Sequence, residues 1–254
     1  MEDQDRAARR ARVRLVAIGG LALALLVGGG VLLTNAVSGQ DASTAPSGER
    51  RSSTPHPTPS ASSRGKMTPA KAKPMHLLKP ESGKDGFSVG FPRTGPGAAS
   101  AAVYYLEESP FLDDVRTRQQ LSAVTSKGSS AYIDKQVSEV RKVREAAGLA
   151  PSGGVPGGLT FTTNVNAIRA TPLVNRRLVQ VWLNYDRYAT KPDGTPANEP
   201  IKDETTDLLL IWEDGDWKIT DESRYRKLRT FPASYDPDSP ISWQSGWWQV
   251  AHVA

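Results

Sequence analysis

A cluster of carboxylates lies between two tryptophans in the segment LIWEDGDWKI, residues 210–219. Grouped carboxylates can act as general acids and bases or bind a hard cation such as calcium. These three acids supply too few oxygen ligands for a calcium loop. An Asp-Gly pair between two apolar runs is instead typical of the type I′ turn of a β-hairpin. We therefore predict a hairpin in which Trp212 faces Trp217 across the strands, with the acids in a solvated turn.

The residue types that the chain lacks exclude several other kinds of chemistry. There is no cysteine, so disulfides, thiolate nucleophiles and cysteine-bound zinc are excluded. The three histidines, His56, His76 and His252, are far apart in the sequence, which disfavours a histidine metal site or a Ser-His-Asp triad. The segments GPGAAS and PSGGVPGG lack the Gly-Lys-Ser/Thr sequence and the strand-to-helix setting of a phosphate-binding loop. We predict no metal site and no cofactor.

The basic charge of the chain belongs to its first third. The formal net charge is +5, but residues 85–254 contain nineteen Lys and Arg against twenty-one acids. The excess lies in residues 1–14, with five Arg against three acids, and in residues 38–84, with eight Lys and Arg against three acids. Direct nucleic-acid binding by the C-terminal region is therefore not expected, because such binding depends on concentrated positive charge.

An uncharged segment near the N-terminus predicts a membrane anchor. Residues 15–37 are predominantly apolar and long enough to cross a hydrocarbon core of about 30 Å as one helix. The five arginines before this segment predict that residues 1–14 stay in the cytoplasm and that the rest of the chain lies outside the cell membrane. A cleaved signal peptide is the alternative, but the apolar run and its basic leader are longer than usual for one.

Residues 38–84 differ sharply in composition from residues 85–254. Twenty of these forty-seven residues are Ser, Thr or Pro, and all eighteen aromatic residues of the chain lie at or after Phe87. Residues 38–84 therefore contain too little apolar surface to offset the entropy lost on folding, and we predict a disordered stalk. The folded domain is expected to begin at residue 85.

Three helices and then four strands are expected in residues 85–222. Capping residues, first-turn prolines and apolar periodicity predict helices over about residues 94–106, from 110 onward, and over about 130–147. Alternating patterns predict strands at about 159–170, 176–189, 205–213 and 216–222. This order predicts an α+β fold, with three helices packed on a curved antiparallel sheet of about four strands.

The order of these elements carries a resemblance to a known fold. Helices, a long strand, a strand ending in the polar loop TKPDGTPANEPIKD and a W-x-D-G-x-W-K-I hairpin resemble the nuclear transport factor 2-like (cystatin-like) cone over residues 85–222. With the predicted tail, anchor and stalk, the chain is similar to bitopic membrane assembly factors of type IV secretion and conjugation systems. The resemblance implies a non-enzymatic scaffold, with membrane-complex proteins as partners and a possible homo-oligomer. It rests on architecture alone.

The same resemblance leaves two alternative functions open. Members of this fold that are enzymes or ligand binders use the mouth of the cone, with an acid as base and an aromatic partner. A membrane-tethered domain of this kind would bind a small molecule or hydrolyse one, using groups in the cavity. The candidate cavity residues are Tyr185, Asp186, Tyr188 and Asp207. The other alternative is a sensor of the cell envelope.

The C-terminal segment, residues 223–254, contains a basic run and is rich in tryptophan. The basic run could meet an acidic partner or anionic lipid, or form a solvated edge. The tryptophans could anchor an interface, or the segment could fold back onto the sheet. The candidate interaction residues are Arg224, Arg226, Lys227, Arg229, Trp243, Trp247 and Trp248.

Overall fold

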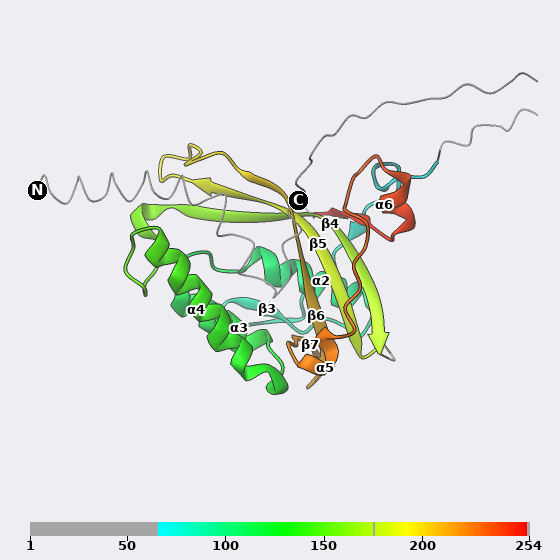
Figure 1. Cartoon of the computed structure of the whole chain (residues 1–254), viewed down its shortest axis with the longest axis horizontal. Coiled ribbons are helices and arrows are strands. Elements are labelled where there is room, and N and C mark those ends of the chain that lie inside the picture. Colours follow the sequence, from blue (N-terminus) through cyan, green and yellow to red (C-terminus); the bar gives the residue numbers. More distant parts are fainter. Residues whose placement is uncertain (1–65, 175, 253–254) are drawn as a thin grey trace, which may run out of the picture. The chain divides into compact units, whose positions relative to one another are not determined.

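The main sheet of the computed structural model curls into a half-barrel of six strands, in the order β1-β8-β4-β5-β6-β7 (Figure 1). The structure describes residues 66–252 apart from residue 175. The predicted anchor, residues 15–37, lies outside this part, as do residues 1–14 and most of the predicted stalk. Within residues 66–252 no helix combines the length and apolar character needed to cross a membrane.

Neighbouring strands of the main sheet pair antiparallel, except that β1 runs parallel to β8. The expected four strands are all present, and two short strands extend the sheet past β4. The strands are β1 (Met75–His76), β4 (Thr160–Val174), β5 (Leu178–Thr190), β6 (Ile201–Glu213), β7 (Asp216–Ile219) and β8 (Trp248–Ala251). A separate hairpin consists of β2 (Ser82–Lys84) and β3 (Phe87–Val89).

Three helices of more than one or two turns accompany the sheet in the described part of the chain. They are α2 (Gly95–Glu107), α3 (Asp114–Val124) and α4 (Ser130–Ala146). Shorter pieces are α5 (Ser223–Arg226), α6 (Pro240–Gln244) and the 3₁₀ turns η2 (Pro69–Lys71), η3 (Lys127–Ser129) and η4 (Pro156–Gly158). The α+β prediction is confirmed, with helices and a curled, mostly antiparallel sheet.

Helix α2 packs against the concave face of the sheet because its inner side is made of small residues. Ala98, Ala101 and Ala102 are fully buried, and they let the helix approach the strands closely. Thr94 caps the helix by accepting a hydrogen bond from the Gly97 amide at 3.0 Å. A Cβ at Gly97 would lie 2.0 Å from the Pro92 carbonyl oxygen, so only glycine fits there.

The second helix begins later than expected from Pro110. Its N-cap is Asp113, whose carboxylate accepts a hydrogen bond from the Arg116 amide at 2.9 Å. Leu112 just before it has a positive φ of 62°, which breaks any continuous helix from Pro110. The cap residue therefore decided the boundary, since a carboxylate at this position satisfies an otherwise unpaired amide.

The sheet curls at three irregularities of strand pairing. The β4–β5 register shifts between Val165 and Ala167 and again between Pro172 and Val174. The β5–β6 register shifts beside Tyr185. Such bulges bend a strand and increase its twist, so they account for the curvature that the hydrophobic pattern alone does not specify.

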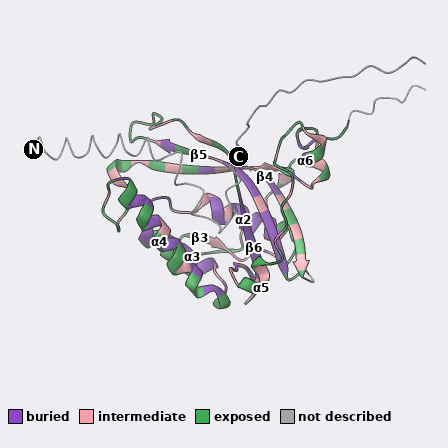
Figure 2. Ribbon diagram, viewed as in Figure 1, coloured by how far each residue is buried: buried purple, intermediate pink, exposed green. Residues whose placement is uncertain are grey.

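The two faces of the sheet are covered by different parts of the chain. On β5, Val179, Val181 and Leu183 belong to the main core together with α2, and the alternate residues face the other way. That opposite face is covered by the C-terminal strap, which we define as residues 223–247. Burial on both faces explains why most of β5 and the middle of β6 are buried (Figure 2).

The folded part of the chain begins earlier than residue 84, where the predicted stalk was expected to end. Residues 69–84 contain η2, β1 and β2, and β1 pairs with β8 through Met75 opposite Val250. Leu77 packs on the main core, and the Leu78 amide donates to Ser100 Oγ at 2.9 Å. The few apolar residues of this segment pack against the edge of the sheet and the main core. These contacts offset the low hydrophobicity of the segment itself.

The predicted hairpin of β6 and β7 is confirmed in its register. Trp212 lies opposite Trp217, and their ring centroids are 5.3 Å apart at an angle of 74°. Asp214 and Gly215 have the positive φ angles of the expected turn. The expectation that all three acids are solvated is wrong for Asp216. Its buried carboxylate accepts from the amides of Phe91 and Trp217 and pairs with Lys218 Nζ at 3.0 Å.

Candidate functional site

The four residues predicted to line a cavity do not come together. Tyr185 lies on the concave face within the main core. Asp186 and Tyr188 point to the opposite face, where Tyr188 Oη donates to Asp186 Oδ2 at 3.1 Å. Asp207 also faces the strap. Because alternate residues of a strand point to opposite faces, neighbours in sequence such as Tyr185 and Asp186 cannot share a cavity.

Asp207 holds the C-terminal strap to the sheet. It is 1% exposed, accepts a hydrogen bond from Gln180 Nε2 at 2.9 Å and pairs with Arg229 Nε at 3.1 Å. The Oε1 atom of Gln180 in turn accepts from the Thr230 amide at 2.9 Å. Burial raises the pKa of Asp207, and Arg229 and Gln180 oppose that shift. These contacts give Asp207 a structural role beneath the strap, on the face of the sheet opposite the main core.

The four basic residues of the strap lie in different environments. Arg229 is nearly buried on Asp207, so it does not belong to a solvated edge. Arg224 pairs with Glu222 at 2.7 Å and lies over the ring of Tyr225. Arg226 pairs with Asp221 at 3.3 Å, and Lys227 is exposed. An interaction surface built from all four basic residues is therefore incompatible with the structure.

The tryptophans at the end of the strap have separate environments. Trp247 is fully buried, donates from Nε1 to the Ala233 carbonyl at 2.8 Å and packs on Tyr235. It holds the strap in place and cannot anchor a partner. Trp248 is 42% exposed, and its ring lies 4.7 Å from that of Trp243 in an edge-to-face arrangement. The strap thus folds back onto the sheet, and Trp248, directly after it, remains partly exposed.

A groove of about 450 Å³ lies beside Trp248, between the first turn of α2 and strands β1, β4 and β8. Its lining contains one charged residue, Lys73, and no carboxylate. Ile241 of α6 is 63% exposed and lies two residues before Trp243 in the sequence. The lining residues are Lys73, Pro74, Met75, Gly95, Pro96, Ala99, Ile168, Ala170, Gly246 and Trp248.

A second candidate site lies on the concave face, at the end of the sheet near the loops that flank β4 and β5. Arg187 is only 4% exposed there. Its guanidinium lies 5.0 Å from the ring centre of Phe111 and 5.4 Å from that of Tyr185. Its Nε donates to Thr163 Oγ1 at 2.9 Å. Burial lowers the pKa of Arg187, while Tyr185 and Glu204 act in the opposite direction.

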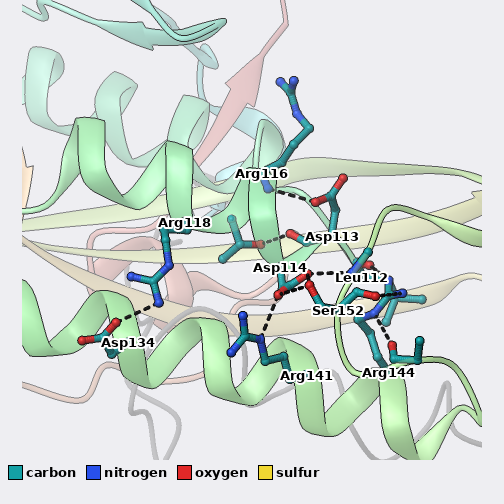
Figure 3. Close-up of polar contacts among 12 residues, drawn as sticks. Leu112, Asp113, Asp114, Arg116, Arg118, Asp134, Arg141, Arg144 and Ser152 are labelled. Carbon is teal, nitrogen blue, oxygen red and sulfur yellow. Dashed lines mark hydrogen bonds and ion pairs between the residues drawn. The ribbon is translucent and has the colours of Figure 1, made fainter.

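Polar contacts around Asp114 position the loops at this end of the sheet (Figure 3). Asp114, 1% exposed, accepts from the Gly153 amide at 2.9 Å, from Ser152 Oγ and from Arg141 Nε at 2.8 Å. Burial by itself raises the pKa of Asp114, but these hydrogen bonds outweigh it and lower that pKa to about 2. The loop between α4 and β4 is therefore tied to the start of α3.

Arg144 completes this set of contacts from the last turn of α4. It donates to the carbonyls of Leu112, Ala150 and Gly154, the last two at 2.8 Å. Leu112 follows Phe111, and both pack with Phe161 in one apolar cluster. The Asp114 and Arg144 contacts thus fix the ring that covers Arg187. They are a structural support for the second site.

Sequence reasoning missed most of this second site. Tyr185 was a candidate, but its neighbours on the concave face are Arg187 and Glu204, and Phe111 lies against Arg187. The one available signal was spacing, because Tyr185 and Arg187 are two residues apart in a predicted strand and must share a face. Nothing local indicated that Phe111 would close over the guanidinium.

Comparisons of the chain with family models, curated proteins and solved structures found no match. Among residues 66–252, no group of three or more His, Cys, Asp or Glu side chains is arranged to hold a metal ion.

Proposed function

We propose that this chain is a single-pass, N-in membrane protein whose extracytoplasmic domain is a nuclear transport factor 2-like cone. It acts as a non-enzymatic scaffold in a membrane-spanning complex of the conjugation or type IV secretion kind. Its docking surface is the groove beside Trp248, and exposure of that tryptophan is the observation that carries the proposal. Exposed aromatic side chains next to an apolar groove are typical anchors of protein interfaces.

The fold supports this proposal at the level of architecture. A curled sheet holds α2 in its concavity, and the β6–β7 hairpin has the register expected of the cone. The strap and strands β1 and β8 are additions to the elements on which the resemblance rests. These additions supply one side of the groove, and α2 and β4 supply the other, so the proposed docking surface exists only where the additions meet the core elements.

The chemistry of the groove favours one kind of occupant. The lining is almost wholly apolar, with Lys73 as its one charged residue. The first turn of α2 contributes Gly95 and Pro96, and the N-terminus of a helix favours a negative charge nearby. The occupant that fits is an apolar segment carrying a carboxylate, supplied by another protein of the membrane complex.

The proposal is tested by recovering the full chain from membranes after crosslinking, with Trp248→Glu as the test variant. A carboxylate at this position would repel the acidic residue of the partner and disrupt the apolar contact. The matched control is Val115→Glu, because Val115 is 53% exposed on α3, outside the residues that line the groove. Partner membrane proteins should be lost with Trp248→Glu and retained with Val115→Glu.

Retention of the same partners by Trp248→Glu would refute the docking surface while leaving a scaffold function open. Recovery of no other membrane protein with the unmodified chain would refute the scaffold function itself.

A further inference from the structure

The Nη atoms of Arg187 and the hydroxyl of Tyr185 lie next to each other on the concave face and donate to no residue that the structure describes. Tyr185 is 2% exposed and Arg187 is 4% exposed. Within residues 66–252, the hydrogen bond of the Arg187 guanidinium is the one from Nε to Thr163, so its Nη atoms are unused. The Tyr185 hydroxyl likewise donates to no described residue. The Nη atoms of Arg187 and the Tyr185 hydroxyl are not among the polar atoms of the described residues that are both fully enclosed and unpaired, so they retain some contact with solvent.

A guanidinium that is only 4% exposed has lost most of its water, and this desolvation is costly when no carboxylate pairs with it directly. No ion pair within 4.0 Å joins Arg187 to an acid of the described residues. Glu204 lies opposite Tyr185 in the β5–β6 register and is half-buried, but it stays beyond that distance. The aromatic rings of Phe111 and Tyr185 stabilise the cation only in part.

From this arrangement we propose a ligand site: the Nη edge of Arg187 and the Tyr185 hydroxyl bind the carboxylate of a small organic acid. A guanidinium presents two parallel donors that match the two oxygens of a carboxylate. The hydroxyl supplies a further donor to the same group. This site is distinct from the Trp248 groove, and its function goes beyond scaffolding.

The surroundings of the guanidinium define the rest of the ligand. Phe111 and Phe161 are in edge-to-face contact at 4.5 Å, and Leu149 and Ile201 pack on the same cluster. These side chains come from the α2–α3 loop, the α4–β4 loop and the first residues of β4 and β6, and Phe111 among them lies against Arg187. An acid with an aromatic or aliphatic body fits such walls better than a fully hydrated inorganic anion.

The hydrogen bonds of Asp114 and Arg144 preorganise the site. They hold the α4–β4 loop and Leu112 in place, so Phe111 is positioned over Arg187 before any ligand arrives. A rigid site loses less entropy on binding than one built from mobile loops. An arginine with a purely structural role does not need unused Nη donors. The binding experiment below therefore tests whether the Nη atoms of Arg187 bind a ligand.

The test titrates the purified full chain in detergent with sodium benzoate, following the unfolding temperature and the heat of binding. Benzamide, which has the same ring without the charge, is the ligand control, and inorganic phosphate tests an anion without an apolar body. We expect benzoate to raise the unfolding temperature, and benzamide and phosphate to have much smaller effects.

Variants separate a ligand site from a structural role. Arg187→Met keeps the apolar stem between the rings and should weaken benzoate binding about 10- to 100-fold, as expected for charge-assisted hydrogen bonds. Tyr185→Phe should weaken it about 3- to 10-fold. Glu204→Gln should strengthen it, because it removes a negative charge near the site. Arg118→Met, at an exposed arginine of α3, is the matched control and should leave binding unchanged.

The proposal fails if benzoate does not bind, if benzamide or phosphate binds equally well, or if Arg187→Met retains the affinity. It also fails if Tyr185→Phe and Glu204→Gln, whose folding is checked by circular dichroism, both leave the affinity unchanged. None of these outcomes bears on Trp248, so failure here leaves the proposed scaffold function intact.

Discussion

Two buried glutamines of this domain differ in hydrogen bonding and should therefore differ in their contribution to stability. Gln120 is 2% exposed, and its Nε2 donates to the Tyr105 carbonyl at 3.0 Å. Gln136 of α4 is 1% exposed, yet neither atom of its amide has a partner among the described residues. A buried amide without hydrogen bonds costs free energy that an apolar side chain of similar size would not.

Replacing Gln136 by leucine is therefore expected to stabilise the protein by about 1–2 kcal/mol, because it removes an unsatisfied amide at nearly constant volume. The free energy of unfolding in urea is the measurement. Gln120→Leu is the control and should destabilise by about 1–3 kcal/mol, since it leaves the Tyr105 carbonyl unpaired. Loss of stability in Gln136→Leu would mean that the amide has a partner, such as an ordered water.

A titration at Asp114 gives a second prediction at this scale. Its pKa is lowered from 3.8 to about 2 in the folded state, so its contribution to stability is complete above the unfolded pKa. That contribution, about 2 kcal/mol, is lost as the pH falls from about 4 to about 2. Asp114→Asn should lose it at neutral pH and show a flatter stability curve in that window.

Urea unfolding at several pH values measures this effect. Asp134→Asn is the control, because its ion pair with Arg118 is exposed and should contribute less than about 1 kcal/mol. An unchanged acid limb in Asp114→Asn would contradict the assignment of the effect to that carboxylate.

Among the elements, the C-terminal strap is the one that most changes the expected fold. It covers the outer face of β5 and β6 through Tyr225, Arg229, Thr230 and Phe231. It leads directly into β8, which pairs with β4 (Figure 1). A face that alternation predicts to be solvated is thereby buried. The strands predicted from long alternating runs were found, whereas β1 and β8 were not predicted. Strands of two and four residues carry too little periodicity to be recognised without their partners.

The two adjacent tryptophans of this region should respond differently to truncation. Trp247→Ala is expected to destabilise the domain by about 3–5 kcal/mol, because it leaves a large cavity beneath the strap and loses the hydrogen bond to Ala233. Trp248→Ala should cost less than about 1.5 kcal/mol, since the side chain is 42% exposed and mainly loses its contact with Trp243. Chemical denaturation of both variants distinguishes them. Equal losses would mean that Trp248 is also part of the core.

For the whole molecule, the expected organisation is a cytoplasmic tail, one membrane span, a tether and a folded domain outside. Only the folded domain lies within the described residues, and its ordered part begins before the predicted end of the stalk. In the proposed organisation the tether would therefore end before residue 69 and not at residue 84.

The absence of cysteine from the chain makes its orientation easy to test. A cysteine introduced by Ser82→Cys, at an exposed position of β2, should react with a membrane-impermeant maleimide in intact cells. A cysteine introduced by Ala8→Cys should react only after lysis. The reverse pattern would contradict the N-in orientation. Loss of the Ala8→Cys label after lysis would indicate a cleaved signal peptide.

Features that depend on neighbouring residues could be predicted from the sequence alone. Asp214 and Gly215 specified the turn that pairs Trp212 with Trp217, alternation specified which side of β5 joins the core, and the Thr94 cap with its alanine-rich run specified α2. Each of these depends on interactions within a few residues along the chain. The α+β class follows from them, since the elements must bury one apolar face each.

Contacts between distant segments became known only from the three-dimensional fold. The fold separated Tyr185 from Asp186, Tyr188 and Asp207, buried Trp247, left Trp248 exposed, and placed Phe111 over Arg187. Phe111 and Arg187, for example, are 76 residues apart in the sequence. The energies of such pairings depend on the desolvation and geometry of both partners. A residue's type states what it can bind, but burial and a partner determine what it does.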